Sequence, residues 1–233
     1  MAASSQVIKA LHDLHLKLHG VQEDLTRGPR QIAAKQAAVD KRKAELDARR
    51  DRFKQLKMMA DQKNLQLKTN EAKINDLRTK LNIAGSNREY EIITGQMAAD
   101  TMANSVLEDE ILEALTRIDT MQGEVRQAEQ ELAAGETALK QAKADVTARE
   151  PGLTAAAAAL QKEVAEAERL LPNDIAGQYR RAVQGLGADA LAAVENRVCT
   201  ACHMQLTSQK IVELNSGKLM FCTCGRLLYT PER

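Results

Sequence analysis

The sequence contains very few aromatic residues. Two phenylalanines, three tyrosines and no tryptophan occur among its 233 residues, whereas pockets for small molecules are usually lined by several aromatic side chains. A large globular core is therefore not expected. Hydrophobic residues still reach 44%, much of it alanine, and charged residues reach 28%. This mixture is typical of long helices and coiled coils.

Long apolar runs and recognisable catalytic groupings are also missing. No stretch approaches the 18 or so apolar residues of a membrane span, and residues 1–20 lack the apolar run of a secretion signal. We therefore expect a cytoplasmic protein. No serine or cysteine belongs to a recognisable grouping with histidine and carboxylate, and no glycine-rich phosphate loop is present. The sequence thus favours a protein that is not an enzyme.

Apolar residues recur with a strict period of seven in two long series. A sustained heptad period keeps one side of a helix facing a partner helix, as in a left-handed coiled coil. One member of the second series, Asn104, is polar. The first series is Leu11, Leu18, Leu25, Ile32, Val39, Leu46, Phe53, Ala60, Leu67, Ile74 and Leu81. The second is Tyr90, Met97, Asn104, Ile111, Ile118, Val125, Leu132, Leu139, Val146, Leu153, Leu160 and Ala167.

A turn near residues 82–88 separates the two series. Gly85 suits the end of a helix, and Ser86 or Asn87 suits the cap of the next one. Folding the chain there predicts an antiparallel hairpin in which paired positions add to about 171, so that Phe53 meets Ile118 and Leu81 meets Tyr90. Two chains that exchange their helices would satisfy the same pattern.

The domain organisation follows from this pattern. Residues 1–171 are predicted to form the antiparallel coiled-coil hairpin, and residues 172–233 a linker helix and a small metal-bound β unit. The expected fold class is mainly α, with a long hairpin followed by a C-terminal β zinc ribbon. Pro29 and Pro151 fall inside the helices, and each is expected to kink or interrupt its helix because proline lacks the amide donor.

Charge is unevenly distributed along the hairpin. Residues 27–57 hold eleven basic and four acidic residues, whereas residues 58–113 hold six basic and ten acidic ones. The basic belt, defined as residues 27–57, is able to bind RNA phosphates or an acidic protein. Ion pairing with the partner helix is the simpler interpretation. Candidate contact residues are Arg42, Arg49, Arg50, Arg52, Lys210, Lys218 and Arg226.

All four cysteines lie within one short C-terminal segment. Cys199 and Cys202 form a C-x-x-C pair, and Cys222 and Cys224 form a C-x-C pair. Residues 210–214 and 218–221 are predicted to be the strands of a β-hairpin that carries one pair at each end. Four thiolates on two tight turns are able to surround a tetrahedral Zn²⁺. The metal would then supply folding energy that so small a segment lacks.

Two alternatives to the four-cysteine site remain open. His203 follows Cys202 directly and would replace a thiolate if the short C-x-C pair failed to deliver both sulfurs. A disulfide-linked or metal-free site is the other alternative. The remaining histidines, His12, His15 and His19, share one helix face and are expected at the surface or rim of the hairpin base.

The order of these parts resembles the bacterial C4-type zinc ribbon proteins with an N-terminal coiled coil. The resemblance rests on Asn87-Arg-Glu-Tyr90 after the turn, on Tyr179-Arg-Arg181, and on Cys222-Thr-Cys-Gly-Arg-Leu-Leu-Tyr229. It implies that Cys199, Cys202, Cys222 and Cys224 bind the metal. The family usually has two residues inside its last cysteine pair, where this chain has only Thr223.

The resemblance also implies partners. Members of that family have been linked to the alternative sigma factor sigma 54, to flagellar gene expression and to RNA binding. A regulatory adaptor is therefore one expectation for this chain, acting as a monomer or a coiled-coil dimer. A structural spacer that holds two protein partners apart is the other.

Overall fold

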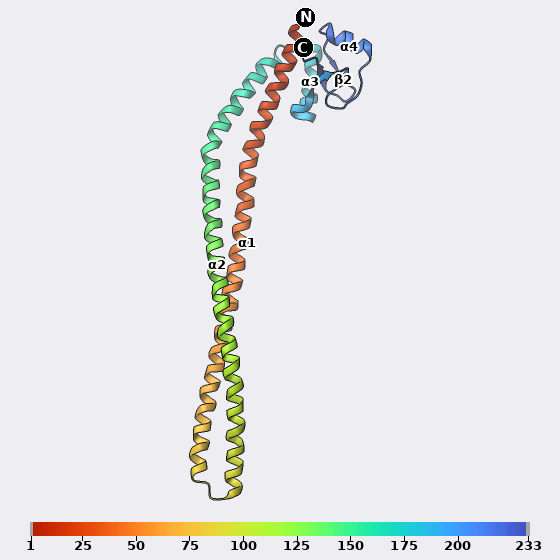
Figure 1. The fold of residues 1–233 in the computed structure, drawn as a ribbon. Helices are drawn as coiled ribbons and strands as arrows, with labels where there is room; N and C mark the ends of the chain where they lie inside the picture. The colour runs from red at the N-terminus through yellow and green to blue at the C-terminus, as the bar shows by residue number, and fades with distance from the viewer. Residues whose placement is uncertain (1, 232–233) are drawn as a thin grey trace. The chain divides into compact units, whose positions relative to one another are not determined.

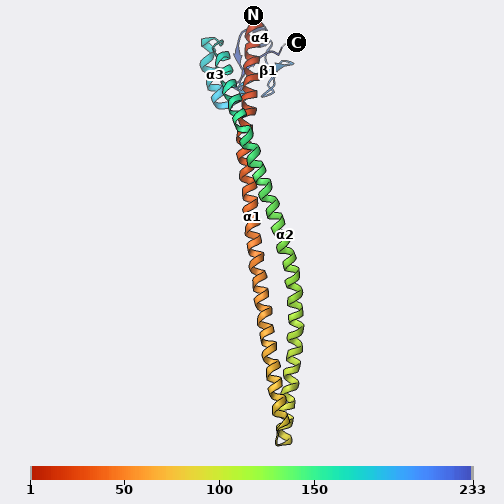
Figure 2. The ribbon, with the colours of Figure 1, turned by 90° about the vertical axis from the view of Figure 1, so that its left-hand side faces the viewer.

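The computed structural model describes the backbone of residues 2–231 and the side chains of residues 5–231. Two long helices, α1 (Ala2–Asn82) and α2 (Asn87–Glu168), precede the shorter α3 (Asn173–Leu186). A 3-10 turn, η1 (Gly187–Ala190), leads into a small C-terminal sheet that also carries α4 (Ser208–Asn215). The ribbon views show α1 and α2 running antiparallel beside each other (Figures 1 and 2). The predicted fold class is confirmed.

The turn between α1 and α2 is stabilised as the sequence predicts. The Glu89 amide donates to the Ser86 hydroxyl at 3.3 Å, and the Glu89 carboxylate accepts from the Gly85 amide at 3.2 Å. The bond to Ser86 gives a partner to an amide that the first turn of a helix otherwise leaves unpaired, and the bond to Glu89 fixes Gly85 just before the cap. Ser86 is therefore the residue that caps α2.

The heptad series mark the buried side of both long helices. Every member of the first series is buried or half-buried, with Leu11 fully buried and Leu46 2% exposed. In the second series only Tyr90 is exposed, at 53%. The expected contact between Leu81 and Tyr90 is therefore wrong, although the period itself is confirmed.

The register of the two helices differs from the predicted one by about three residues. Gly28 packs against Val146, and Gly135 packs against Val39, so paired positions add to 174. With this sum of 174, Met121 lies opposite Phe53, and Ile118 lies opposite Leu56. The predicted pairing of Phe53 with Ile118 is therefore wrong.

A second buried series on α2 explains the shift in register. Four of its eight members are small, three alanines and one glycine, so the series lacks the large apolar side chains that reveal a heptad pattern. The buried or half-buried positions are Ile93, Asp100, Leu107, Ala114, Met121, Ala128, Gly135 and Ala142. This second series, and not the one that begins at Tyr90, lies opposite the first series of α1.

Neither internal proline ends its helix. α1 continues through Pro29 and α2 continues through Pro151, so of the two expected effects, a kink or an interruption, the interruption does not occur. Pro29 and Gly152 line a cavity of about 550 Å³ between the two helices. No helix among the described residues is long and apolar enough to cross a membrane.

The chain divides into two compact units, Met1–Ala33 with Gln141–Arg233, and Ala34–Lys140. The first unit contains the four-stranded sheet, in the order β2-β1-β4-β3. Its strands are β1 (Leu191–Glu195), β2 (Val198–Cys199), β3 (Met220–Phe221) and β4 (Leu227–Tyr229). β1 and β4 pair in parallel, and the other pairs are antiparallel. One core joins the sheet to the ends of the long helices: Ile8, Leu11, Val164, Leu171, Tyr179, Ala190, Leu191, Leu227 and Tyr229.

The segment that was predicted to be the first strand of the β-hairpin is a helix. Residues 210–214 belong to α4, whose first turn is capped by the Thr207 hydroxyl as it accepts from the Lys210 amide. Ile211 and Leu214, three positions apart, pack on the sheet side of this helix. The spacing of three and the capping threonine favour a helix over a strand. The predicted second strand is present, shortened to β3.

Histidines of α1 connect this helix to the C-terminal elements. His15 is 7% exposed, and its Nε2 lies 2.5 Å from the Tyr179 hydroxyl, which donates to Glu168 at 3.0 Å. The Nδ1 of His12 lies 2.9 Å from the Tyr229 hydroxyl. The prediction that these histidines are surface or rim residues is wrong for His15. His15 thus pairs with Tyr179 of α3, and His12 pairs with Tyr229 of β4.

We expect the first unit to lose stability as the pH falls below about 6.5. Burial lowers the pKa of His15 below its ordinary value of 6.5, against the opposing effect of Glu168. The unfolded state therefore binds the proton more readily, so stability is fully present above pH 6.5 and declines toward the folded pKa. Thermal unfolding between about pH 7.5 and 5.5 measures the effect. His15→Gln cannot titrate and should lose less stability over this range, whereas an equal loss in both proteins would contradict the assignment.

Candidate metal centre

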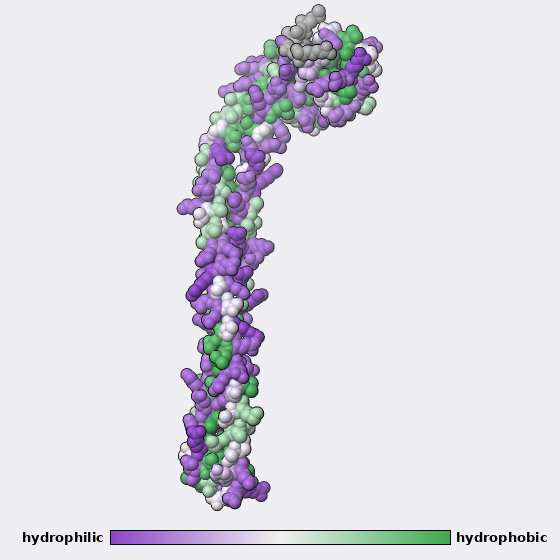
Figure 3. Space-filling model, in the orientation of Figure 1, coloured by the Kyte–Doolittle hydropathy of each residue, from purple (hydrophilic) through white to green (hydrophobic). Residues whose placement is uncertain are grey.

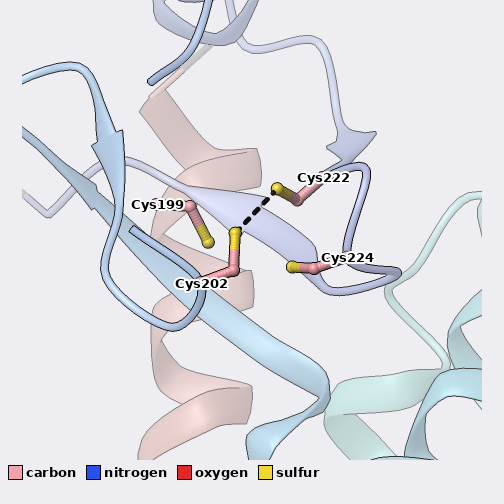
Figure 4. Close-up of side chains that lie close together, drawn as sticks. All are labelled: Cys199, Cys202, Cys222 and Cys224. Atoms are coloured by element: carbon pink, nitrogen blue, oxygen red, sulfur yellow. Dashed lines mark hydrogen bonds between the residues drawn. The ribbon is translucent and has the colours of Figure 1, made fainter. Parts of the chain in front are cut away.

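The four cysteines stand at the ends of short strands. Cys199 is the last residue of β2, and Cys202 lies in the turn that follows it. Cys222 comes directly after β3, and Cys224 lies in the turn before β4. Since β1 and β4 are paired neighbours in the sheet, the two cysteine turns meet at one place. Figure 4 shows the four thiols pointing toward one another.

The sulfur positions fit a tetrahedral metal ion. All four Sγ atoms lie within 4.8 Å of one another, and those of Cys202 and Cys222 are 3.6 Å apart. A tetrahedral ion with metal–sulfur bonds of about 2.3 Å needs sulfurs roughly 3.8 Å apart. Cys199 and Cys222 are buried, and Cys202 and Cys224 are half-buried. The cluster is thus able to hold a metal ion with little movement.

Backbone hydrogen bonds shape the first cysteine turn. The Cys199 amide donates to the Met204 carbonyl at 3.1 Å, and the His203 amide donates to the Cys199 carbonyl at 2.9 Å. His203 adopts a left-handed conformation with φ of 57°. This tight loop brings Cys202 back beside Cys199. The hairpin turn that precedes it has positive φ at Asn196 and Arg197, as two-residue β-hairpins require.

The shorter second turn delivers both of its thiols. The Gly225 amide donates to the Cys222 carbonyl at 2.9 Å, and the Cys222 amide donates to the Arg226 carbonyl at 2.8 Å. Gly225 has φ of 87°, a conformation that a side chain would strain. The missing residue in the C-x-C pair therefore does not keep Cys224 out of the cluster.

The thiols of Cys224 and Cys202 have pKa values that are shifted in opposite directions. Burial raises the pKa of the Cys224 thiol, but hydrogen bonds from the Arg226 amide and side chain outweigh it and lower the pKa to about 6. For Cys202 the amide of Met204 acts to lower the pKa, but burial and the neighbouring thiols raise it to about 12. Such opposite shifts are expected where several thiols crowd one place and compete to ionise.

The two alternatives to a four-cysteine site were a disulfide-linked or metal-free site and a site in which His203 replaces a thiolate. None of the four cysteines forms a disulfide. His203 is exposed and is not a member of the group whose ligand atoms converge. The structure therefore brings together the four cysteines and leaves His203 outside.

The candidate contact residues of the basic belt mostly bind α2. The Arg42 and Arg49 guanidinium groups donate to the backbone carbonyls of Glu131 and Glu124, at 3.2 and 3.4 Å. Arg50 pairs with the Glu129 carboxylate at 2.6 Å. Within the described part of the chain, Arg52 has no hydrogen bond or ion pair. Much of the belt thus serves contacts within the hairpin.

The candidate residues around the C-terminal sheet, Lys210, Lys218 and Arg226, also make local contacts. Lys218 pairs with Glu213 at 2.9 Å, and the charge of Lys210 lies close to the same carboxylate. The Nε of Arg226 donates to the Asp189 carbonyl at 2.8 Å. Arg226 therefore connects the second cysteine turn to η1, a supporting role that the sequence did not indicate.

Comparison with known proteins shows a shared fold. No protein-family model matches this chain, and no curated protein matches its sequence. The chain is similar to the CT398 protein of Chlamydia trachomatis, with a TM-score of 0.76, 18% identity and 99% of each chain covered. It is also similar to the HP0958 protein of Helicobacter pylori, with a TM-score of 0.55, 18% identity, and coverage of 100% of this chain and 96% of that one. A protein from Mycobacterium smegmatis has a TM-score of 0.54, 18% identity and 98% coverage of both chains.

Proposed function

We propose that the protein is a zinc-binding adaptor in which the four cysteines hold one structural Zn²⁺. The observation that carries this proposal is the convergence of four Sγ atoms within 4.8 Å of one another. Sulfur-rich tetrahedral sites favour Zn²⁺ over the oxygen-seeking cations Mg²⁺ and Ca²⁺. The hydrogen bonds from the amides of Met204 and Arg226 would orient the thiolates, as supporting groups do in zinc sites.

A four-thiolate zinc site supports a structural role. Its four positions are filled by protein, so no position is left for a water nucleophile. We therefore propose a protein that acts by binding and not by catalysis. The metal would hold the two cysteine turns together and so fix β4 beside β1, where Leu227 and Tyr229 complete the core of the first unit.

The proposed partner is a transcription component, with sigma 54 as the first candidate. Support for this choice is the resemblance of Asn87–Tyr90 and Cys222–Tyr229 to the C4-type zinc ribbon proteins. Binding of purified sigma 54 to the full zinc-loaded chain, followed by biolayer interferometry, tests the proposal. A structural spacer should show no affinity for the sigma factor, and metal removal should abolish binding only if the C-terminal sheet takes part.

RNA binding by the basic belt is the second candidate, favoured by its surplus of positive charge. If the belt contacts phosphates, the affinity for RNA will fall steeply with salt, because each neutralised phosphate releases counterions. The variant with Arg42, Arg49, Arg50 and Arg52 changed to Ser should then bind more weakly and with a shallower salt slope. A salt titration of both proteins measures this effect.

The contacts of the belt arginines with α2 set the expected size of this effect. Arg42, Arg49 and Arg50 contact α2, so we expect weak and sequence-tolerant binding. Arg52→Ser alone is the matched control, since it removes a charge without removing a contact to α2. Identical affinity and salt slope in the quadruple variant and the unmodified protein would exclude the belt.

A further inference from the structure

The second unit carries an apolar surface on α2 that none of the described residues covers. Ile92, Met102 and Val106 are 57%, 74% and 59% exposed. They belong to a series in which spacings of four and three alternate, as in the contact seam of a coiled coil. The outer seam, as we name it, comprises Arg88, Ile92, Gly95, Ala99, Met102, Val106, Asp109 and Glu113, all of them exposed.

The outer seam lies on the side of α2 that faces away from α1. Ile93, Asn104 and Ile111 are buried in the hairpin, and the outer seam is offset from them by roughly half a turn of helix. From Arg88 to Glu113 it would span about 38 Å, at about 1.5 Å per residue. The space-filling view shows hydrophobic patches among the hydrophilic surface in the part of the hairpin that carries the turn (Figure 3).

The outer seam is complementary to itself when its direction is reversed. Positions whose numbers add to 201 would face each other in an antiparallel pair. Ala99 then faces Met102, and Gly95 faces Val106, so that these two large side chains meet small ones, while Ile92 faces Asp109. Arg88 at one end faces Glu113 at the other, whose carboxylate also accepts from Arg117 of its own helix at 2.6 Å. A parallel pair would instead place Met102 against Met102 and Arg88 against Arg88, which opposes like charges.

We infer that the outer seam is the contact surface for a second copy of this chain, in an antiparallel dimer with a two-fold axis between residues 100 and 101. A two-fold contact uses the same surface on both copies, so each pairing occurs twice. The dimer would therefore gain two ion pairs between Arg88 and Glu113 and four contacts of a large with a small residue. Each copy keeps its own α1–α2 hairpin, and no helix is exchanged.

Sedimentation equilibrium of the full chain over a range of concentrations tests the dimer. We expect a monomer–dimer equilibrium in which Met102→Glu raises the dissociation constant at least about tenfold, because each dimer then buries two unpaired charges. Met58→Glu is the matched control, since Met58 lies in the same unit, is 62% exposed and is outside the outer seam. It should leave the dissociation constant unchanged.

Charge reversal tests the register independently of the apolar contacts. Arg88→Glu should weaken the dimer by opposing two carboxylates, and adding Glu113→Arg should restore it. A protein that stays monomeric up to about 1 mM overturns the proposal. A dimer that neither Met102→Glu nor Arg88→Glu weakens also overturns it, provided that circular dichroism shows unchanged helix in the variants.

Crosslinking tests the direction of the pair. Equal amounts of an Ala99→Cys variant and an isotope-labelled Met102→Cys variant are mixed and treated with a short thiol crosslinker. The antiparallel register predicts links between position 99 of one chain and position 102 of the other, as identified in the crosslinked peptides. Links between two copies of position 99, without the mixed product, would show a parallel pair and overturn the proposal.

Discussion

Cys199→Ser should abolish stable metal binding and unfold the sheet of the first unit. Cys199 is fully buried, and its backbone closes the first cysteine turn. With one of four thiolates gone, the site loses a ligand that serine cannot replace for Zn²⁺. The binding energy of a structural zinc is folding energy, on the order of 10 kcal/mol in small zinc domains. Metal content by mass spectrometry should fall from one equivalent of zinc to near zero.

The helical signal gives a second measure of the same change. Leu227 and Tyr229 of β4 share a core with Ile8 and Leu11 of α1, so the ends of the hairpin should become less stable together with the sheet. Residues 34–140 form the other unit and should keep their helix. We therefore expect a partial loss of helix and a new transition at lower temperature. Loss of nearly all helix would contradict the division into two units.

His203→Ala is the matched control for the cysteine variant. His203 follows Cys202 in sequence but lies outside the group of converging ligand atoms, so its removal should leave the zinc content at one equivalent. A loss of metal in His203→Ala, with metal retained in a Cys224→Ser variant, would show that the histidine replaces the last thiolate. Absence of zinc from the unmodified protein after expression with ample metal would exclude the proposed zinc site.

The heptad period predicted the hairpin because large apolar residues repeat without a break along α1. Its register was not predictable in the same way. On α2 the seam opposite Leu46 and Val39 contains Ala128 and Gly135, which carry little hydrophobic signal even though they are buried or half-buried. Small residues fill an interface as well as large ones where the helices approach closely. Counting apolar residues therefore identified only one of the two seams of α2.

The cysteine cluster was predictable because two closely spaced cysteine pairs in one short segment favour a single four-thiol site. The elements between the turns were not. Residues 210–214 contain β-branched Ile211 and Val212, which favour a strand, but the Thr207 cap and the packing of Leu214 favour a helix. The parallel pairing of β1 with β4 joins residues 36 positions apart. Such a contact leaves no local pattern in the sequence.

The histidine–tyrosine contacts show a third limit of sequence reasoning. Three histidines on one face of an amphipathic helix end are usually solvated, and nothing near His15 in the sequence indicates burial. Its partner Tyr179, and the Glu168 carboxylate to which Tyr179 donates, lie more than 150 positions away. Two of the three tyrosines in the chain face these histidines.

Leu11→Ala should lower the stability of the first unit by about 2–5 kcal/mol, the range for a buried leucine whose removal leaves a cavity. Leu11 is 0% exposed and packs in the core that includes Val164, Tyr179 and Leu227. Elements from both ends of the sequence hold this core in place, so it cannot easily close around the lost side chain. Urea unfolding followed by near-ultraviolet circular dichroism measures the change, because Tyr179 and Tyr229 dominate that signal in a chain without tryptophan.

Leu16→Ala makes the same chemical change on the same helix at a side chain that is 46% exposed. It should change the stability by less than about 1 kcal/mol. Phe53, which the sequence suggested as a buried member of the seam, is only half-buried, with the Lys57 ammonium 4.8 Å from its ring centre. We therefore expect Phe53→Ala to fall below the 3–5 kcal/mol of a buried phenylalanine. Equal losses for Leu11→Ala and Leu16→Ala would contradict the core described for the first unit, because only Leu11 is enclosed by it.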